Sequence, residues 1–270
     1  MKKVSFVLAV KDGEYFLENT INSILNQNYQ NLEVIVVDDH SSDRTPEILK
    51  TMVGSHPNLI TLKSPENKSG VAAARNLGTR VASGEIIFPV DADDPNFPNR
   101  AEVSVAELEK NKADIFYANL ERFYPETGER TLRHFQPYDP VMLKYINYIA
   151  HAGSSAYYKY VFDKLGGYDE NIKIGEDWDL WLRAQSAGFK FCCKNIALSQ
   201  FTMHKAQTTN SSDRGKIKNR IYWNKVVREK NKIFDVDPEY VKNNAEPAVK
   251  EFYFDKNHEI WFSEDSIPKN

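Results

Sequence analysis

Residues 85–94 read EIIFPVDADD, a run in which apolar side chains are followed at once by three carboxylates within four positions. The apolar part is typical of a buried strand in a parallel sheet, because such strands read as nearly continuous hydrophobic runs. Asp91, Asp93 and Asp94 then crowd together where the strand ends. Like charges at this spacing repel one another strongly, so a cation, a proton or solvent is expected to relieve them.

The segments before residue 85 follow the same design, in which apolar runs alternate with amphipathic stretches. This alternation predicts an α/β fold, with a doubly wound, mainly parallel sheet flanked by helices. The expected strands are residues 4–10, 32–39, 59–63 and 85–90, and the expected helices are residues 15–27, 45–53 and 70–84. Gly84 is expected to close the third helix in a left-handed conformation.

The pattern loosens after residue 113. A small antiparallel hairpin is predicted to turn near residues 126–128, and a further strand is predicted at residues 154–159. EDWDLWLRAQSAG, from residue 176, predicts a helix closed by Gly188. Because no linker rich in Pro, Gly or Ser interrupts the chain, we expect one domain in two halves, followed by a C-terminal segment. The three parts are residues 1–112, 113–205 and 206–270.

Composition and charge set limits on the partners. The chain has 270 residues and a net charge of -3, which gives no global basic field to gather nucleic acid. Residues 204–232 nevertheless carry nine Lys or Arg against two acids, and residues 233–270 carry nine acids against four lysines. We expect a solvated basic helix followed by an acidic tail. The basic segment could close over a bound diphosphate, or its face with Tyr222 and Trp223 could rest on anionic lipid.

Further features bear on location. The sequence has no run near the roughly 20 apolar residues that span a bilayer. Its apolar start ends at Lys11 and Asp12 without a cleavage pattern, so a strand is expected there rather than a leader. Cys192 and Cys193 are adjacent and lack zinc-finger spacing, which predicts reduced thiols. A cytoplasmic protein is therefore expected, and peripheral contact with the inner face of a membrane stays open.

Asp91 and Asp93 flank Ala92 just beyond the buried strand, where two carboxylates can approach one hard cation or the ribose and phosphates attached to it. Mg²⁺ or Mn²⁺ held by one or two carboxylates fills its remaining positions with phosphate oxygens and water. A nucleotide diphosphate is therefore the partner predicted at this strand end. The alternative is a plain turn, because Asp also favours loops.

Three other places offer polar side chains with two interpretations each. Asp39 either belongs to a turn and helix cap or accepts the N3 hydrogen of uracil, which cytosine lacks. Glu176 and Asp177 either cap a helix or do chemistry at its positive end; beside them, Trp178 offers a ring on which a sugar could stack. His204 is either an ordinary satisfied histidine or a further ligand of a carboxylate-bound metal.

Three ordered blocks together resemble the family 2 glycosyltransferases, which are inverting enzymes of the GT-A fold. The blocks are VSFVLAVKDGEYFLENTINSILNQNYQNLEVIVVDDHSSDRTPEIL, GVAAARNLGTRVASGEIIFPVDADD and GGYDENIKIGEDWDLWLRAQSAG, and they cover about residues 3–205. The resemblance implies a donor that is a nucleotide-diphosphate sugar, usually a UDP-sugar, and a divalent metal, Mn²⁺ or Mg²⁺. It implies transfer to a hydroxyl of a saccharide or lipid-linked saccharide acceptor in cell-surface glycan synthesis.

The resemblance also implies roles for particular residues. Residues 1–112 would be the nucleotide-sugar-binding half, and residues 113–205 the acceptor-binding and catalytic half. Asp177 would be the general base that takes the proton of the acceptor hydroxyl, with Glu176 and Trp178 on the acceptor side. Asp93 would hold the metal, with His204 as an additional ligand. The residues implied around the donor are Ala9, Val10, Lys11, Glu14, Asp39, Arg75, Asp91 and Ala92.

One residue departs from the family pattern, since Lys11 stands where the first strand of such enzymes often ends in a tyrosine that stacks on uracil. A lysine covers a ring only with its stem, so the base is less firmly implied than the fold. Two alternatives remain: a metal-dependent phosphatase or nucleotidyltransferase, and a non-catalytic protein of GT-A-like fold that binds a sugar nucleotide. No motif specifies the transferred sugar, the acceptor, the linkage or the oligomeric state.

Overall fold

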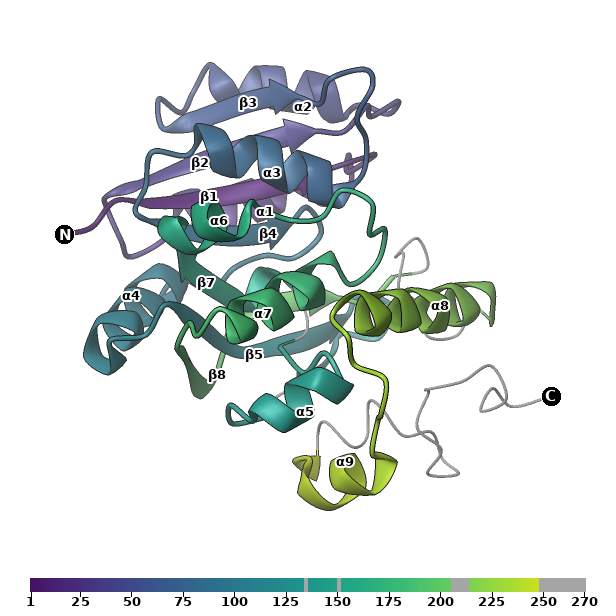
Figure 1. Cartoon of the computed structure of the whole chain (residues 1–270). Coiled ribbons are helices and arrows are strands. Elements are labelled where there is room, and N and C mark those ends of the chain that lie inside the picture. The colour runs from purple at the N-terminus through teal and green to yellow at the C-terminus, as the bar shows by residue number, and fades with distance from the viewer. Residues whose placement is uncertain (134–135, 150–151, 205–213, 248–270) are drawn as a thin grey trace.

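The structure is a computed structural model that describes residues 1–133, 136–149, 152–204 and 214–247 (Figure 1). The strands are β1 Val4–Val10, β2 Leu32–Asp38, β3 Leu59–Lys63, β4 Ile86–Asp91, β5 Ile115–Tyr124, β6 Glu129–Arg133, β7 Ser155–Tyr158 and β8 Phe191–Thr202. The helices are α1 Leu17–Leu25, α2 Thr45–Val53, α3 Val71–Val81, α4 Arg100–Asn111, α5 Pro140–Tyr145, α6 Lys159–Leu165, α7 Glu176–Ser186, α8 Arg214–Lys230 and α9 Pro238–Asn244. A short 3-10 turn, Ala152–Ser154, precedes β7.

The described strands form one sheet in the order β3-β2-β1-β4-β7-β5-β6, and β8 pairs with β5. β1 runs parallel to β2 and β4, and β2 runs parallel to β3. β7 is antiparallel to β4 and β5, β6 is antiparallel to β5, and β8 returns parallel to β5. The doubly wound, mainly parallel sheet is confirmed, and the predicted hairpin is formed by β5 and β6.

The central strands are apolar throughout because helices cover both faces of the sheet. Val7 and Val37 face the core that also contains residues of α3, α6 and α7. Phe6 and Leu8, which alternate with Val7 along β1, face the core that contains residues of α1, α2 and α4. Figure 1 shows α3, α6 and α7 on the near face of the sheet. Every residue of β2 is buried. This doubly covered sheet is the rigid base that holds the loops at the strand ends.

The structure corrects the role expected for Gly84. Helix α3 ends at Val81 with Ala82 as its C-cap, and Gly84 does not adopt a positive φ. A Cβ atom on Gly84 would lie 2.5 Å from Oγ of Ser5 and 2.7 Å from the Ser5 backbone nitrogen. The N–H of Gly84 also donates to that Oγ at 2.9 Å. Glycine is therefore required here by the close approach to β1 and not by a helix cap.

Helix α8 is attached to α7 through the last turn of α8. Nζ of Lys230 lies 2.8 Å from Oδ2 of Asp169 and 2.8 Å from Oδ1 of Asp179, whose side chain is fully buried. Nδ2 of Asn231 donates to the same Asp179 oxygen at 3.0 Å. The basic helix expected from the sequence thus exists, and residues 248–270 of the expected acidic tail lie outside the described residues.

Two findings bear on location and redox state. Among the residues that the structure describes, no helix has both the length and the apolar character that crossing a membrane requires. Cys192 and Cys193 are free thiols on β8. The first is buried and the second half-buried, as expected for neighbours on a strand that point to opposite faces.

Candidate active site

The carboxyl ends of β1, β2 and β4 meet at one edge of the sheet. The loop after β1 is tied to the loop after β2 by bonds in both directions. The N–H of Asp12 donates to Oγ of Ser41 at 2.9 Å, and the N–H of Ser42 donates to Oδ1 of Asp12 at 2.7 Å. These bonds hold the two loops together, so this rim of the site is formed before any ligand arrives.

Several residues expected around the donor lie on this rim. The carbonyl of Val10 accepts the N–H of Asp39 at 2.7 Å, while the Val10 side chain is buried in the core. Lys11 is exposed, and Ala9 is partly buried. Oε2 of Glu14 accepts a backbone N–H from the loop after β2 at 3.2 Å. Only the Lys11 side chain extends freely into solvent among these four.

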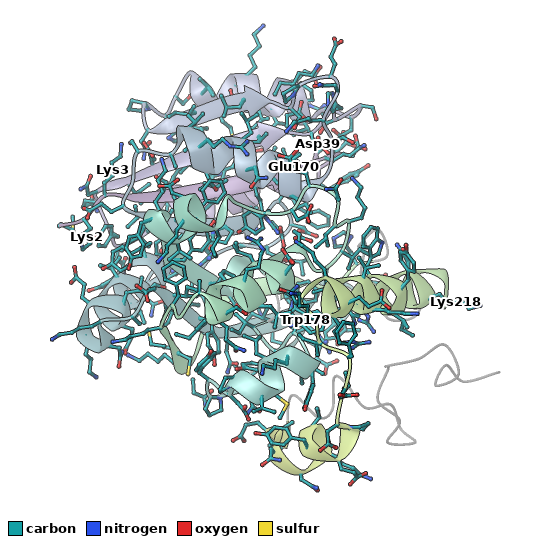
Figure 2. All side chains as sticks on the ribbon, in the orientation of Figure 1. Lys2, Lys3, Asp39, Glu170, Trp178 and Lys218 are labelled. Carbon is teal, nitrogen blue, oxygen red and sulfur yellow. The ribbon has the colours of Figure 1, made fainter. Side chains whose placement is uncertain are left out.

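Asp39 follows β2 and lies at the same end of the sheet (Figure 2). It is 5% exposed, and its Oδ2 accepts the N–H of Gly70 at 2.7 Å. Its Oδ1 is buried and has no hydrogen-bond partner among the described residues. A buried acceptor without a partner costs roughly 1–3 kcal/mol. A ligand that donates a hydrogen bond to this oxygen would therefore be favoured.

Arg75 joins the two acidic motifs. Its Nη2 lies 2.5 Å from Oδ1 of Asp91, and its Nη1 donates to Oε1 of Glu176. Burial acts to lower the pKa of Arg75, but Asp91 and Glu176 raise it well above its usual range, so the guanidinium stays charged. Burial raises the pKa of Glu176 to about 7, although Arg75 opposes this effect.

Asp93 and His204, the two residues expected to bind metal, contact each other. Nε2 of His204 lies 2.8 Å from Oδ2 of Asp93, and the imidazole packs on Phe16 with ring centroids 4.7 Å apart. Across the described ranges, no three His, Cys, Asp or Glu side chains are grouped to hold a metal by themselves. One carboxylate and one imidazole fit an ion whose other ligands are phosphate oxygens and water, as at many nucleotide sites.

Asp94 differs from its two acidic neighbours. It is 1% exposed, and its Oδ1 accepts the N–H of Thr202 on β8 at 2.8 Å. Burial raises the pKa of Asp94 well above its usual range, and the charges of Asp93 and Asp91 add to this effect. The repulsion within EIIFPVDADD is thus reduced by a guanidinium at Asp91 and an imidazole at Asp93, and at Asp94 by a raised pKa, which favours the neutral form.

Asp177 occupies the first turn of α7 and is 8% exposed. Its Oδ1 accepts hydrogen bonds from Nδ2 of Asn147 at 3.2 Å and from the N–H of Trp178 at 2.7 Å. The N-cap of α7 is Gly175, with φ +83° and no side-chain cap, which does not support the capping interpretation. The helix dipole stabilises a carboxylate here as the anion, and Asn147 orients it.

The structure corrects the role expected for Trp178. The residue is 1% exposed, and its Nε1 donates to the carbonyl of Leu143 at 2.7 Å. A ring enclosed in the core offers no face to a sugar, so Trp178 does not line an acceptor surface. Its bond to Leu143 instead anchors α7 to α5.

Two residues of this site carry no signal in the sequence that marks them. Asn147, which orients Asp177, lies between α5 and the turn before β7 in a stretch without a motif. Phe16, which packs on His204, is one of 15 phenylalanines and has no feature that marks it. A third residue, Asn76, bonds to the backbone of Tyr168 on the segment before α7. It could have been found from the sequence, because it follows Arg75 in the stretch ARN.

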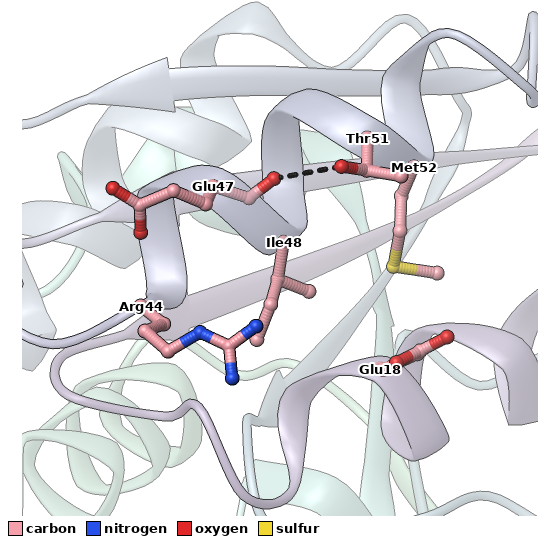
Figure 3. A pocket seen from close by; sticks show the side chains of 6 residues that line it. All are labelled: Glu18, Arg44, Glu47, Ile48, Thr51 and Met52. Carbon is pink, nitrogen blue, oxygen red and sulfur yellow. Dashed lines mark hydrogen bonds between the residues drawn. The ribbon is translucent and has the colours of Figure 1, made fainter.

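A cleft between α1 and α2 contains none of the predicted site residues. Its walls combine apolar and charged side chains from the two helices and from the residue before α2 (Figure 3). The lining residues are Glu18, Arg44, Glu47, Ile48, Thr51 and Met52. Because α1 and α2 pack on the sheet face opposite to α7, this cleft is separate from the candidate active site.

Comparison with known proteins identifies the family. Residues 5–166 match the model of glycosyl transferase family 2, and this match spans more than half of the chain. The chain belongs to glycosyltransferase family 2. An uncharacterized glycosyltransferase of Rickettsia typhi is 29% identical over 222 residues, which are 77% of this chain. This chain spans 66% of the length of that relative.

A second relative has a named reaction. It is WfaP of Escherichia coli, a UDP-Glc:alpha-D-GlcNAc-diphosphoundecaprenol beta-1,3-glucosyltransferase. It is 30% identical over 210 residues, which are 76% of this chain and 78% of that protein.

Solved structures confirm the GT-A fold. Residues 1–349 of Staphylococcus aureus TarS, in complex with UDP-GlcNAc, superpose with a TM-score of 0.68 at 16% identity, over 93% of this chain and 72% of that one. The mannosyltransferase PcManGT of Pyrobaculum calidifontis, in complex with GDP-Man and Mn²⁺, gives a TM-score of 0.65 at 19% identity, over 88% of this chain and 67% of that one.

Proposed function

We propose that this chain is a metal-dependent, inverting glycosyltransferase. It would move a sugar from a nucleotide-diphosphate donor, a UDP-sugar, to a hydroxyl of a saccharide or lipid-linked saccharide acceptor in cell-surface glycan synthesis. One observation carries the proposal: the ends of β2 and β4 carry the buried acceptor of Asp39 and the Asp93–His204 pair, and Arg75 joins the end of β4 to the first turn of α7, which holds Asp177. In that order, the three kinds of group suit the nucleobase of a donor, the metal that binds its diphosphate, and the attacking hydroxyl of an acceptor.

The base of the donor would be recognised by Asp39. Its Oδ1 can accept the N3 hydrogen of uracil, which cytosine lacks, while the Gly70 N–H holds the other oxygen in place. Lys11 is exposed on the same rim, where its stem can cover a ring or its ammonium can meet a phosphate.

Asp93 and His204 would hold the divalent ion, Mn²⁺ or Mg²⁺. When bound, that ion stabilises the negative charge of the departing diphosphate. The Mn²⁺ in the structure of PcManGT supports this part of the proposal by analogy within the fold. Asp91 and Ala92, between the metal residues and Arg75, would border the sugar and ribose.

Asp177 would act as the general base. It would take the proton of the acceptor hydroxyl as that oxygen attacks C1 of the sugar and the bond from C1 to the diphosphate breaks. One displacement inverts the anomeric centre, so the protein forms no covalent bond to the sugar. A well placed base contributes about 10²–10⁴ in rate. The buried position of Asp177 and its bond from Asn147 keep it in one orientation.

Thermal unfolding and product release test the proposal together. UDP with Mn²⁺ or Mg²⁺ should raise Tm by mass action. Asp93→Asn should remove the part of this rise in Tm that depends on the metal. The control Asp163→Asn, at an exposed position on α6, should keep the whole rise. UDP should be released from UDP-glucose with a GlcNAc-diphosphate lipid as acceptor. Stabilisation by CDP equal to that by UDP would contradict the role of Asp39, and binding without any UDP release would favour the non-catalytic alternative.

We also propose that α8 rests on the inner face of an anionic membrane that holds the acceptor. Residues 214–230 carry seven Lys or Arg against one acid. Lys218, Tyr222 and Lys225 are exposed and, at helical spacing, share one side of α8. Figure 2 shows Lys218 on this helix. The other role left open, closure over a diphosphate, involves residues 205–213, which lie outside the described residues.

Vesicle sedimentation at low salt tests the membrane contact. Each basic residue near an anionic surface contributes about 1 kcal/mol, so the double variant Lys218→Glu, Lys225→Glu should bind phosphatidylglycerol vesicles at least about 30-fold more weakly. The control variant Lys50→Glu, Lys110→Glu, with the same net charge and changes at exposed positions on α2 and α4, should bind normally. Equal binding by both variants would exclude α8 as the contact.

A further inference from the structure

Arg75 links the donor side of the site to the helix that carries the expected base. Its two terminal nitrogens contact Asp91 at the end of β4 and Glu176, the first residue of α7. We propose that Arg75 is a positioning residue, which fixes the first turn of α7 and therefore Asp177 against the strand end. This inference rests on the proposed function and replaces the donor-binding role that the family resemblance implies for Arg75.

The shape and burial of the guanidinium suit this role. Its nitrogens bond in fixed directions within one plane, so one side chain can hold two carboxylates at a set separation. Arg75 is 3% exposed. Both terminal nitrogens already contact a carboxylate, and a donor that displaced either contact would leave that carboxylate in a shielded place without its cation. A lysine, with a single ammonium on a flexible stem, cannot bridge the two motifs in the same way.

The segment that leads into α7 depends on the same stretch of α3. Nδ2 of Asn76 donates to the carbonyl of Tyr168 at 2.9 Å, and Oδ1 of Asn76 accepts the N–H of Tyr168 at 2.8 Å. The Tyr168 ring in turn lies 5.8 Å from the guanidinium carbon of Arg75. Asn76 thus holds the start of this segment and Arg75 holds its end.

The first turn of α7 needs such support because it has no side-chain cap of its own. It also brings Glu176 and Asp177 close to Asp91, and all three raise the pKa of Arg75. Without the guanidinium, Asp91 and Glu176 would lose the side chain that joins them, and the start of α7 would be free to move away from β4. A displacement of about 1 Å at a catalytic group can lower a rate about 10²-fold.

The test compares Arg75→Lys, Glu176→Gln and the double variant with Arg80→Lys, a control on the exposed side of α3. With UDP-glucose and Mn²⁺ as probes, Arg75→Lys should lower kcat about 10²-fold and change the Kd of UDP less than about threefold. Because the two residues act as one unit, the double variant should lose no more than Arg75→Lys alone. Hydrogen exchange across residues 168–180 should be at least about 10-fold faster in Arg75→Lys and unchanged in Arg80→Lys.

Several results would overturn the inference. Equal losses in kcat and UDP affinity would make Arg75 a donor ligand, and additive losses in the double variant would show that Arg75 and Glu176 act separately. Unchanged exchange across residues 168–180 would show that Arg75 does not hold α7, and this measurement needs no activity. If Arg75→Lys does not fold, Glu176→Gln must show the loss of kcat at constant UDP affinity. A wild-type protein without any transfer would refute the proposed function, and the exchange result would still decide the positioning role.

Discussion

Replacing Asp177 by Asn separates chemistry from structure with a single change of atoms. Oδ1 of Asp177 accepts from Asn147 and from the N–H of Trp178, and the amide oxygen of an asparagine can accept both bonds. Helix α7 has no side-chain cap to lose. The free energy of unfolding should therefore change by about 1 kcal/mol or less.

The effect on catalysis should be much larger. An amide cannot take the proton of the acceptor hydroxyl, so kcat should fall by about 10²–10⁴. That fall corresponds to about 2.7–5.4 kcal/mol in the activation free energy. The affinity for UDP and metal should stay within about threefold of wild type, because Asp39, Asp93 and His204 are untouched.

The assay measures transfer from UDP-glucose, the Kd of UDP with Mn²⁺ and urea unfolding on the same preparations. Asp163→Asn makes the same change of atoms at an exposed position on α6 and should leave all three quantities unchanged. If Asp177→Asn keeps more than half of the transfer rate, Asp177 is not the base and Glu176 becomes the next residue to replace. If UDP affinity falls in parallel with transfer, Asp177 supports the donor site instead.

Three further predictions concern stability and are checked by urea unfolding. Burial raises the pKa of Glu33, but hydrogen bonds from a lysine and two serines outweigh it and lower the pKa from 4.5 to about 2. The resulting stabilisation, about 3 kcal/mol, is present above pH 4.5 and is lost towards pH 2. The difference in unfolding free energy between wild type and Glu33→Gln should therefore shrink as the pH falls. Lys230→Met should lower the free energy of unfolding by about 2 kcal/mol, because Nζ pairs with two carboxylates, one of them fully buried. Its control, Lys225→Met on the exposed side of α8, should lower it by less than about 0.5 kcal/mol. Gly84→Ala should lower the free energy of unfolding by about 2 kcal/mol or more. Gly54→Ala, whose Cβ would meet no atom closer than 3.6 Å, should change it little. Equal losses in the two variants would contradict the close approach of Gly84 to Ser5 as the cause.

The fold and the place of the site follow from local properties of the sequence. β2 is buried at every position, and a strand with both faces buried can be read as an unbroken apolar run. Because parallel strands end at the same edge, the residues after β2 and β4 had to meet there. Asp39, Asp91 and Asp93 could therefore be placed together from spacing alone.

The features that the sequence analysis missed or placed wrongly depend on packing between distant segments. The sequence does not distinguish an aromatic ring that lines a sugar site from one that packs in the core. The bond from Trp178 to Leu143 shows that this ring belongs to the core. The close approach that demands Gly84 comes from Ser5. β7 enters the sheet between β4 and β5 although it follows both in the chain, and no periodicity in a four-residue strand reveals its neighbours.

The sequence predicts that the three carboxylates of EIIFPVDADD need partners, but it does not show which residues those partners are. Their spacing requires that their repulsion be relieved, but the groups that relieve it lie 16 residues away for Asp91, through Arg75, and 111 residues away for Asp93, through His204. Asp94 is instead buried against β8, and this burial raises its pKa well above the usual range. Asp93 is partly exposed, with 27% of its side chain open to solvent, and under the proposed function it is the carboxylate that would bind the metal. The sequence therefore predicts that the three charges need partners, and the fold gives each carboxylate a different partner.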